Sequence, residues 1–544
     1  MSDFSYASGP SDIPLIGLTI GDQLEQIAEL FPENEALVDV PSGRRWTYRQ
    51  LDSAVSALST ALLGLGVAKG DRLGIWAPNV PEWVLIQYAA AKVGAILVNI
   101  NPASRRQELA YVLHQAEITV LVSVSRFKNT DYVALIDDVR PDAPFLREVI
   151  LIDTMAWDEL AGTPIDRVAI SDRMRTLDRD DPINIQYTSG TTGSPKGATL
   201  THHNILNNGF LVTEGQGFTA DDRLCVQVPF YHCFGMVLGN LGSMVHGSCV
   251  VIPSPWFDAA ATLAAIKAER CTALYGVPTM FISLLEHPAF DQADLTSLRT
   301  GTMAGSPCPV EYMKRVVAEM NMDEITISYG MTETSPISTH TRADASLERR
   351  TSTVGTPLPH VEVKIVDPET GLTVPRGMTG ELCTRGYLVM QGYWREPEKT
   401  ADAVDINGWM HSGDLATMDS EDYVNIVGRL KDMVIRGGEN LYPREIEEFL
   451  YSHPGIADVQ IIGVPDPKFG EELCAWIRMR EGHPPLNAHS LREFCTGKLA
   501  HYKIPRYVQI TSEFPMTATG KIRKIAMREQ SVRDLKLDDA VATA

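Results

Sequence analysis

The sequence lacks several features that would each indicate a particular class of protein. Its 544 residues carry a formal net charge of −21, and such an acidic chain offers no general surface for nucleic acid or anionic membranes. No run of about 20 apolar residues occurs, so no membrane-spanning helix is expected. The first residues do not combine a basic segment with a long apolar core, so no signal peptide is expected.

Cysteine is scarce, and its spacing suggests no pairing. The chain has eight cysteines, and no two of them form a CxxC pair. This pattern predicts reduced, mostly buried thiols and therefore a cytoplasmic location. Cys233 lies within an aromatic motif, but we interpret it as a wall residue and not as a nucleophile. The sequence contains neither an internal repeat nor a low-complexity tract.

Short apolar segments alternate with helical patterns along most of the chain. Thr47 and Gln50 have the spacing of a capping box, and residues 258–269 have the composition of a helix. The strand candidates are residues 73–76, 96–100, 118–124, 148–153, 183–187, 224–228, 248–252, 271–276 and 325–330. This alternation predicts an α/β fold of doubly wound layers with parallel strand pairing.

The length and a change of pattern predict two domains. A chain of 544 residues is too long for one core. From about residue 361, short strands joined by Gly, Pro and Asp turns predict a small antiparallel β unit, and a compact α+β pattern follows Arg429. We expect an N-terminal domain of residues 1–430, with a β subdomain at about 355–430, and a small mobile C-terminal domain of residues 431–544.

Residues 187–197, YTSGTTGSPKG, have the composition of a phosphate-binding loop. They fail the pattern GxxxxGK[ST], because Pro195 precedes Lys196 and Gly197 follows it. An apolar strand candidate comes before the loop and a predicted helix after it, which is the usual placement of a phosphate cradle. The residues predicted to hold phosphate are Thr188, Ser189, Gly190, Thr191, Thr192, Gly193, Ser194, Pro195 and Lys196.

Further motifs follow the loop in a fixed order. They are PFYHCFG (229–235), AGSP (304–307), YGMTE (329–333), GWMHSGD (408–414), GRLKDMVIRGGENLYPREIE (428–447) and TATGKIRK (517–524). With the loop, they resemble the signatures of adenylate-forming enzymes, the superfamily of acyl-CoA synthetases, firefly luciferase and peptide-synthetase adenylation domains. The resemblance covers about residues 20 to 530 and is greatest to medium-chain-type fatty acyl-CoA synthetases. It implies a ligase that uses ATP, Mg²⁺ and coenzyme A to convert a fatty acid, through an acyl-adenylate, into acyl-CoA.

The resemblance implies roles for individual residues around the nucleotide. Glu333 would bind Mg²⁺ as a hard oxygen ligand. Thr332 would contact the α-phosphate, and the flat ring of Tyr329 would lie against adenine. The other implied contacts are Gly305 and Ser306 beside adenine, Asp414 on the ribose hydroxyls, and Arg429 on ribose or phosphate. The loop would hold the pyrophosphate that leaves.

The C-terminal motifs imply a moving domain. Lys521 would bridge the carboxylate and the α-phosphate during adenylation, which requires the small domain to close over the large one. Lys431 matches a hinge position, where the backbone would rotate between the two reaction steps. Gly437 and Gly438 would then enter the site, where bare backbone lets a thin pantetheine arm pass.

The acyl group would lie near the aromatic motif. His232 is implied to be a gate or wall beside the carboxylate and is not assigned as a base, because a carboxylic acid is already ionised at pH 7. The residues implied to line the acyl pocket are Tyr231, Gly301, Met303, Ala304, Met331 and Ile337. They include no Asp or Lys that would bind an amino group, which argues against an amino-acid substrate. We expect a medium-chain to long-chain acid.

Several alternatives remain open from the sequence. The acceptor could be a carrier-protein phosphopantetheine in place of coenzyme A, and the acid could be aromatic, as in coumarate-type ligases. A luciferase-like oxygenase shares these motifs, and a non-catalytic nucleotide-binding protein could share the fold. Such a degenerate member is expected to lack Glu333 or Lys521, and both are present.

Overall fold

The computed structural model describes residues 3–188, 195–306, 308–437, 439–516 and 522–537. The chain folds into two units. Unit 1 consists of residues 1–6, 364–383 and 412–544, and unit 2 of residues 7–363 and 384–411. The predicted boundary after residue 430 separates parts that would move against each other. The two units are defined by dense packing, so that boundary stays a prediction.

Unit 2 contains two large sheets whose central strands are parallel, as the α/β prediction requires. The seven-stranded sheet has the order β21 (Gly392–Tyr393), β11 (Lys196–Thr201), β10 (Pro182–Thr188), β5 (Ile96–Asn99), β4 (Arg72–Trp76), β6 (Ile118–Ser123), β9 (Glu148–Leu151). Strands β10, β5, β4, β6 and β9 are parallel, whereas β11 and β21 add antiparallel pairing at one edge.

The second sheet of unit 2 has nine strands. Their order is β18 (Thr356–Pro357), β17 (Ile337–His340), β16 (Glu324–Gly330), β15 (Thr300–Ala304), β14 (Ala273–Gly276), β12 (Arg223–Val226), β13 (Cys249–Ile252), β2 (Glu35–Asp39), β3 (Arg44–Thr47). The run from β16 to β2 is parallel, and the edges are antiparallel. Parallel neighbours bring their carboxyl ends to one edge, where ligands bind in such folds.

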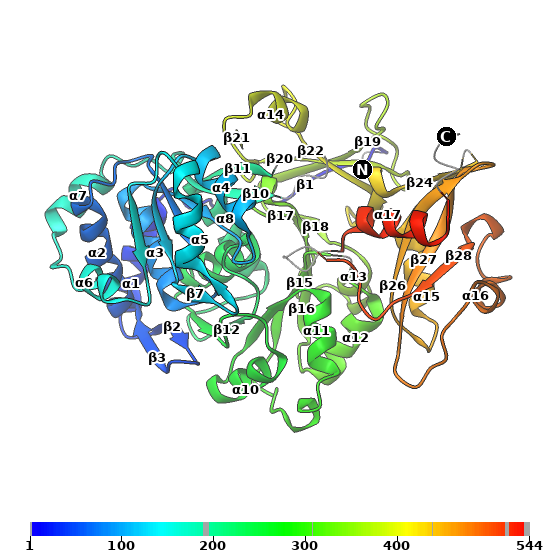
Figure 1. Cartoon of the computed structure of the whole chain (residues 1–544), viewed down its shortest axis with the longest axis horizontal. Helices are drawn as coiled ribbons and strands as arrows, with labels where there is room; N and C mark the ends of the chain where they lie inside the picture. The colour runs from blue at the N-terminus through cyan, green and yellow to red at the C-terminus, as the bar shows by residue number, and fades with distance from the viewer. Residues whose placement is uncertain (1–2, 189–194, 307, 438, 517–521, 538–544) are drawn as a thin grey trace. The chain divides into compact units, whose positions relative to one another are not determined.

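Helices cover both sheets (Figure 1). One of these helices, α3 (Pro81–Val93), is buried along its whole length. Helix α3 contacts α1 (Ile20–Leu30), α2 (Tyr48–Gly64), β2 and β5, and every one of its residues is buried. A helix that is apolar all round belongs in a core. Its one basic residue, Lys92, is fully buried and donates to Glu25 at 2.7 Å and Asp52 at 2.6 Å.

The remaining helices of unit 2 connect or flank these strands. They are α4 (Arg106–Gln115), α5 (Tyr132–Val139), α6 (Met155–Ala161), α7 (Arg167–Met174), α8 (His202–Gly215), α9 (Gly242–Met244), α10 (Ala259–Glu269), α11 (Pro278–Leu285), α12 (Val310–Glu319), α13 (Leu347–Ser352) and α14 (Pro397–Ala403), with a π-helical segment at Phe234–Leu241. Thr47 caps α2 in a capping box with Gln50, as the sequence predicts. Among the described residues, no helix is long and apolar enough to cross a membrane.

The helix predicted after the phosphate loop is present, and it is α8, which begins at His202 after the cap Thr201. A strand that the sequence did not predict lies between the loop and this helix. Lys196–Thr201 forms β11, antiparallel to β10 in the register Thr188 to Lys196. Residues 196–201 pair with β10 on one side and β21 on the other, and this tertiary pairing overrides the local pattern.

The antiparallel β unit predicted from about residue 361 is a five-stranded sheet. Its strand order is β1 (Tyr6–Ser8), β19 (Val361–Val366), β20 (Gly380–Gly386), β22 (Met410–Met418), β23 (Val424–Arg429). Strands β22 and β23 pair antiparallel, and Asp414 lies opposite Arg429.

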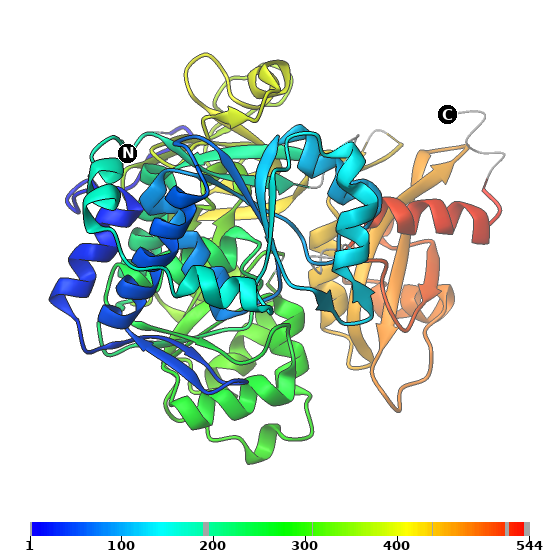
Figure 2. The same ribbon diagram turned by 60° about the vertical axis from the view of Figure 1, so that its left-hand side comes forward.

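The C-terminal part of unit 1 is the predicted α+β module. Its sheet joins β25 (Glu439–Leu441), β24 (Val434–Arg436), β27 (Gly470–Met479) and β26 (Ile456–Asp466), and β28 (Tyr507–Ile510) pairs with β27. The helices are α15 (Pro443–Tyr451), α16 (Ala488–Cys495) and α17 (Lys524–Asp534). Helix α17 packs against β26, and Figure 2 shows this helix, in red, beside the orange strands of the sheet. All eight cysteines of the chain are buried, as the spacing predicts.

Candidate active site

The candidate site of unit 2 is built from segments that follow parallel strands. Tyr231 and His232 follow β12, Gly305 and Ser306 follow β15, and Met331 begins the turn after β16. Because β12, β14, β15 and β16 are parallel neighbours, these segments leave the same edge of the nine-stranded sheet. This edge is the place where an α/β fold binds its ligand.

The described flanks of the phosphate loop are closely paired. Residues 189–194 lie outside the described part of the chain, so no position is given for Ser189, Gly190, Thr191, Thr192, Gly193 or Ser194. Thr188 ends β10, and its hydroxyl donates to the carbonyl of Lys196 at 3.4 Å. The two flanks are thus the ends of one hairpin.

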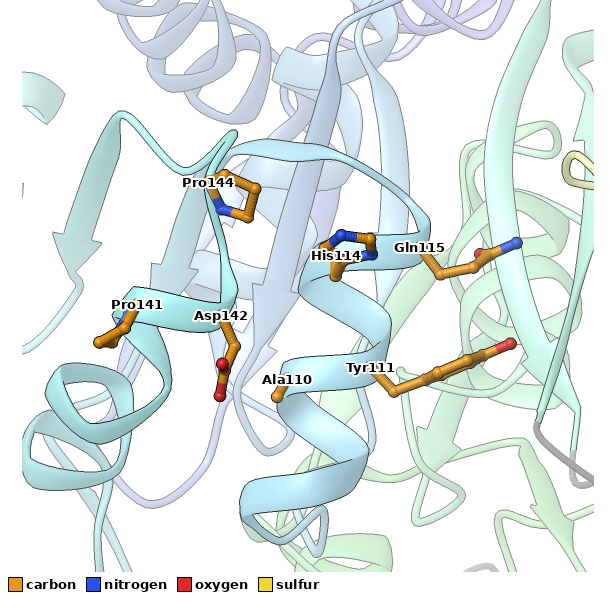
Figure 3. Close-up of a pocket in the computed structure, with 7 residues that line it drawn as sticks. All are labelled: Ala110, Tyr111, His114, Gln115, Pro141, Asp142 and Pro144. Carbon is orange, nitrogen blue, oxygen red and sulfur yellow. The ribbon is translucent and has the colours of Figure 1, made fainter.

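Helix α4 holds both flanks of the loop. The Tyr111 hydroxyl donates to the carbonyl of Pro195 at 3.0 Å, and the Tyr187 hydroxyl donates to Gln115 Oε1. Gln115 Nε2 donates to the carbonyl of Trp394 at 2.8 Å. Figure 3 shows the side chains of Tyr111 and Gln115 extending from the same side of α4. Helix α4 also borders a cavity of about 500 Å³.

Glu333 is a buried carboxylate in the short helical turn Thr332–Thr334. Glu333 is 6% exposed and Thr332 is 8% exposed. Glu333 Oε1 accepts a hydrogen bond from the Tyr393 hydroxyl at 2.8 Å. Among the described residues, no Lys, Arg or His forms an ion pair with it. A buried carboxylate normally has a cationic partner or binds a metal.

Tyr393 also contacts the lysine of the loop. The Lys196 ammonium lies over the Tyr393 ring, 4.6 Å from its centroid. Burial and the neighbouring Glu333 carboxylate raise the pKa of Tyr393, so its hydroxyl stays protonated and acts as a donor. One aromatic side chain therefore touches both the predicted metal ligand and the predicted pyrophosphate lysine.

The donor set of Glu333 fits a hard divalent cation. The Tyr393 hydroxyl is bonded to one oxygen of Glu333, so the second oxygen can bind a ligand. Mg²⁺ prefers one or two carboxylates together with phosphate oxygens and water. Glu333 is the residue that would hold such an ion, and the ion would supply charge neutralisation beside the phosphates.

The predicted adenine-side and acyl-side residues occupy different environments. Tyr329 is partly exposed near the end of β16, and Gly305 and Ser306 are exposed after β15. The His232 ring accepts a hydrogen bond at Nδ1 from the Phe234 amide at 3.3 Å. The Tyr231 carbonyl accepts one from Asn99 Nδ2 at 3.3 Å. Burial raises the pKa of the Tyr231 hydroxyl to about 12.

The other predicted acyl-pocket residues are mostly buried. Met303, Ala304 and Ile337 are at most 5% exposed, and Met331 is half-buried. Gly301 has a φ of +149°, and a Cβ there would lie 2.0 Å from the carbonyl of Leu274. Glycine is therefore required at 301 by the neighbouring strand, whatever the ligand.

Two of the predicted residues of unit 1 form an ion pair. Arg429 Nε lies 3.1 Å from Asp414 Oδ1 across the β22–β23 pair. Lys431 is exposed in the turn Leu430–Asp432. Gly437 has a φ of +60° and donates its amide to the carbonyl of Phe469 at 2.8 Å. Gly438 and Lys521 lie outside the described residues.

Two segments of the chain match a known protein family. The AMP-binding enzyme family matches residues 24–394, and its C-terminal domain matches residues 445–521. The chain belongs to the AMP-binding enzyme family. The two matches show a large N-terminal and a small C-terminal segment, whereas the predicted domain bounds of 1–430 and 431–544 stay predictions.

Relatives within the AMP-binding enzyme family extend over nearly the whole chain. YngI of Bacillus subtilis, whose acyl-CoA synthetase name is provisional, is 47% identical over 97% of this chain and 99% of its own. The medium-chain acyl-CoA ligase ACSF2 of zebrafish, a mitochondrial protein, is 42% identical over 98% of this chain and 91% of its own.

Solved structures of AMP-binding enzymes share the fold. ATP-bound MatB from Rhodopseudomonas palustris superposes with a TM-score of 0.84 at 29% identity, covering 95% of this chain and 99% of its own. A fatty acyl CoA synthetase of Mycobacterium tuberculosis gives a TM-score of 0.73 at 30% identity, with coverage of 95% and 99%. The predicted α/β fold and the enzyme class, an AMP-forming acid–thiol ligase, are thereby confirmed.

Proposed function

We propose that the protein is a fatty acyl-CoA synthetase that joins a medium-chain to long-chain fatty acid to coenzyme A. ATP is cleaved to AMP and pyrophosphate, and Mg²⁺ is required. The relatives are named as acyl-CoA synthetases or acyl-CoA ligases, and the proposal gives this chain the same activity. The observation that carries it is the buried Glu333 carboxylate, which contacts the same tyrosine, Tyr393, as the loop lysine and lies at the carboxyl edge of a parallel sheet.

The first step forms a mixed anhydride. A carboxylate oxygen of the acid attacks the α-phosphorus of ATP, and the bond from that phosphorus to the bridging oxygen breaks, so pyrophosphate leaves with the electron pair. The step brings an anion to a polyanion, so positioning and charge neutralisation dominate the barrier. Lys196 neutralises the leaving pyrophosphate, and Lys521 bridges the carboxylate and the α-phosphate.

The second step forms the thioester. The sulfur of coenzyme A attacks the acyl carbon, the bond to the AMP oxygen breaks, and the thiol proton passes to solvent. Asp414 holds the ribose hydroxyls, since a carboxylate accepts two hydrogen bonds. Arg429 contacts ribose or phosphate. Gly437 and Gly438 leave room for the pantetheine arm.

The predicted acyl-side residues support an apolar acid. Met303, Ala304 and Ile337 are buried and carry no charge, so they match an alkyl chain better than an amino-acid side chain. The buried cysteines, of which no two form a CxxC pair, support a reducing compartment such as the cytoplasm as part of the proposal.

The test is carboxylic-acid-dependent exchange of pyrophosphate into ATP over a panel of chain lengths. We expect exchange that peaks with medium-chain or longer fatty acids and requires Mg²⁺. Glu333→Gln keeps the side-chain shape but removes the charge, so exchange is expected to fall about 100-fold or more. An absence of exchange with every acid would contradict the proposal.

A second measurement identifies the acceptor. AMP release is followed with each active acid, with and without coenzyme A. Release that accelerates with coenzyme A supports the proposed thiol acceptor. Exchange without acceleration by coenzyme A indicates a carrier protein, and a preference for aromatic acids in the panel indicates a coumarate-type ligase.

A further inference from the structure

Tyr393 belongs to none of the motifs that indicate the reaction, yet it contacts two of their residues. It ends β21, where it lies opposite Ala198 of β11, two residues beyond Lys196. Its ring is 4.6 Å from the Lys196 ammonium and its hydroxyl is 2.8 Å from Glu333 Oε1. Tyr393 and Glu333 are each 6% exposed, so the hydrogen bond between them is shielded from water, and Lys196 is half-buried.

The backbone on both sides of Tyr393 is fixed by hydrogen bonds. The Tyr393 amide donates to Thr400 Oγ1 at 2.9 Å, and the Met390 amide donates to the carbonyl of Glu333 at 3.0 Å. The Trp394 amide donates to the carbonyl of Gly197 at 2.7 Å. The residues that flank β21 are thus bonded to the Glu333 turn on one side and to the loop hairpin on the other.

We propose that Tyr393 is a positioning residue that couples the metal ligand to the pyrophosphate lysine. The inference rests on the proposed function, which gives Glu333 and Lys196 these roles. The hydroxyl fixes one oxygen of Glu333 and so directs the other oxygen to Mg²⁺, as partners of metal ligands commonly do. The ring face holds the ammonium by a cation–π contact. Metal and lysine then meet the pyrophosphate in a fixed relative geometry.

The two contacts can be separated by substitution. Tyr393→Phe removes the hydroxyl but keeps the ring over Lys196. Tyr393→Leu removes both. The matched control is Tyr451→Phe, because the Tyr451 hydroxyl also donates to a buried carboxylate, Asp458 Oδ1, at 2.6 Å, in unit 1.

The first measurement is the Mg²⁺ dependence of ATP binding to the full chain, by calorimetry without any carboxylic acid. Tyr393→Phe is expected to need about 10- to 100-fold more Mg²⁺ than the unchanged protein for half-maximal ATP binding. Excess Mg²⁺ is expected to restore the binding. Tyr451→Phe is expected to match the unchanged protein.

The second measurement uses inorganic pyrophosphate with the metal chelated. Tyr393→Phe is expected to bind pyrophosphate like the unchanged protein, because the ring that holds Lys196 remains. Tyr393→Leu is expected to bind it about 3- to 5-fold more weakly, the loss of one cation–π contact. A purely structural role for Tyr393 would not separate the two variants in this way.

Three outcomes would overturn the inference. They are an unchanged Mg²⁺ requirement in Tyr393→Phe, loss of pyrophosphate binding in both variants alike, or no Mg²⁺-dependent ATP binding by the unchanged protein. The exchange assay with the unchanged protein tests the proposed function separately. Altered Mg²⁺ dependence without acid-dependent exchange would support the positioning role and contradict only the proposed reaction.

Discussion

At the scale of single residues, burial divides the ionisable groups of unit 2 into two kinds. Glu333 is buried beside a neutral hydroxyl, an arrangement that a bound cation would complete. The buried imidazoles behave differently, because burial keeps them neutral. It lowers the pKa of His202 and of His246 to about 4 and that of His340 to about 3.

The buried imidazoles predict a loss of stability in acid. Burial in the folded protein lowers the pKa of His340 from 6.5 to about 3. Between these pH values the unfolded chain therefore binds a proton that the folded chain does not. The contribution of His340 is therefore fully present above pH 6.5 and is lost as pH falls toward 3. His340→Gln is expected to reduce the slope of the unfolding free energy against pH by up to about 1.4 kcal/mol per pH unit in this range.

Urea unfolding at a series of pH values between 4 and 7 measures this slope. Gln is chosen because its amide can meet Thr326 Oγ1, which lies 3.0 Å from His340 Nε2. The exposed His489, replaced by Gln, is the control. An equal slope in His340→Gln and the unchanged protein would show that His340 does not contribute to the acid sensitivity.

At the scale of elements, helix α4 and the β10–β11 hairpin form the frame of the phosphate loop. Tyr111 holds Pro195 at one flank, and Gln115 accepts from Tyr187 at the other. No motif covers α4, and its residues are near the loop only because β10 and β5 are adjacent in the sheet. The frame fixes where the ends of the loop lie.

Tyr111→Phe is expected to weaken ATP binding about 5-fold, because one net hydrogen bond of about 1 kcal/mol to a flank of the loop is lost. The control is Tyr132→Phe, in which another tyrosine hydroxyl loses a proline carbonyl, that of Pro102. Both variants are compared by ATP titration. Equal affinity in Tyr111→Phe and Tyr132→Phe would show that the flank contact does not position the loop.

At the scale of the whole molecule, the two reaction steps require different groups at the acyl carbon. In the proposed reaction Lys521 acts in adenylation alone, so Lys521→Ala is expected to abolish acid-dependent exchange and largely to spare thioester formation from supplied acyl-adenylate. The two half-reactions are assayed separately. Equal loss of both would contradict the role of Lys521.

In the proposed reaction, the backbone rotates between the two steps at the turn that contains Lys431. Proline fixes φ and removes the amide hydrogen, so Lys431→Pro is expected to impair one half-reaction far more than the other. The exposed side chain at this position makes a packing defect a minor factor. Unchanged kinetics in both half-reactions would remove the hinge assignment.

The sequence alone identified the five parallel strands of the seven-stranded sheet, the cap of α2 and the family. Apolar runs such as residues 96–100 and 118–124 appear as β5 and β6, because a strand buried on both faces needs nearly continuous apolar residues. Thr47 and Gln50 cap α2 through purely local contacts. The family motifs are local for the same reason, since each is one segment whose residues meet the ligand together.

Only the tertiary structure decided what lies between those segments. Strand β11 was missed because its pairing partners, β10 and β21, stabilise it from outside its own sequence. Tyr393 was missed because its partners, Lys196 and Glu333, lie far from it along the chain. Local pattern reports what a segment prefers, whereas contacts between distant residues depend on how the strands are ordered in the sheet.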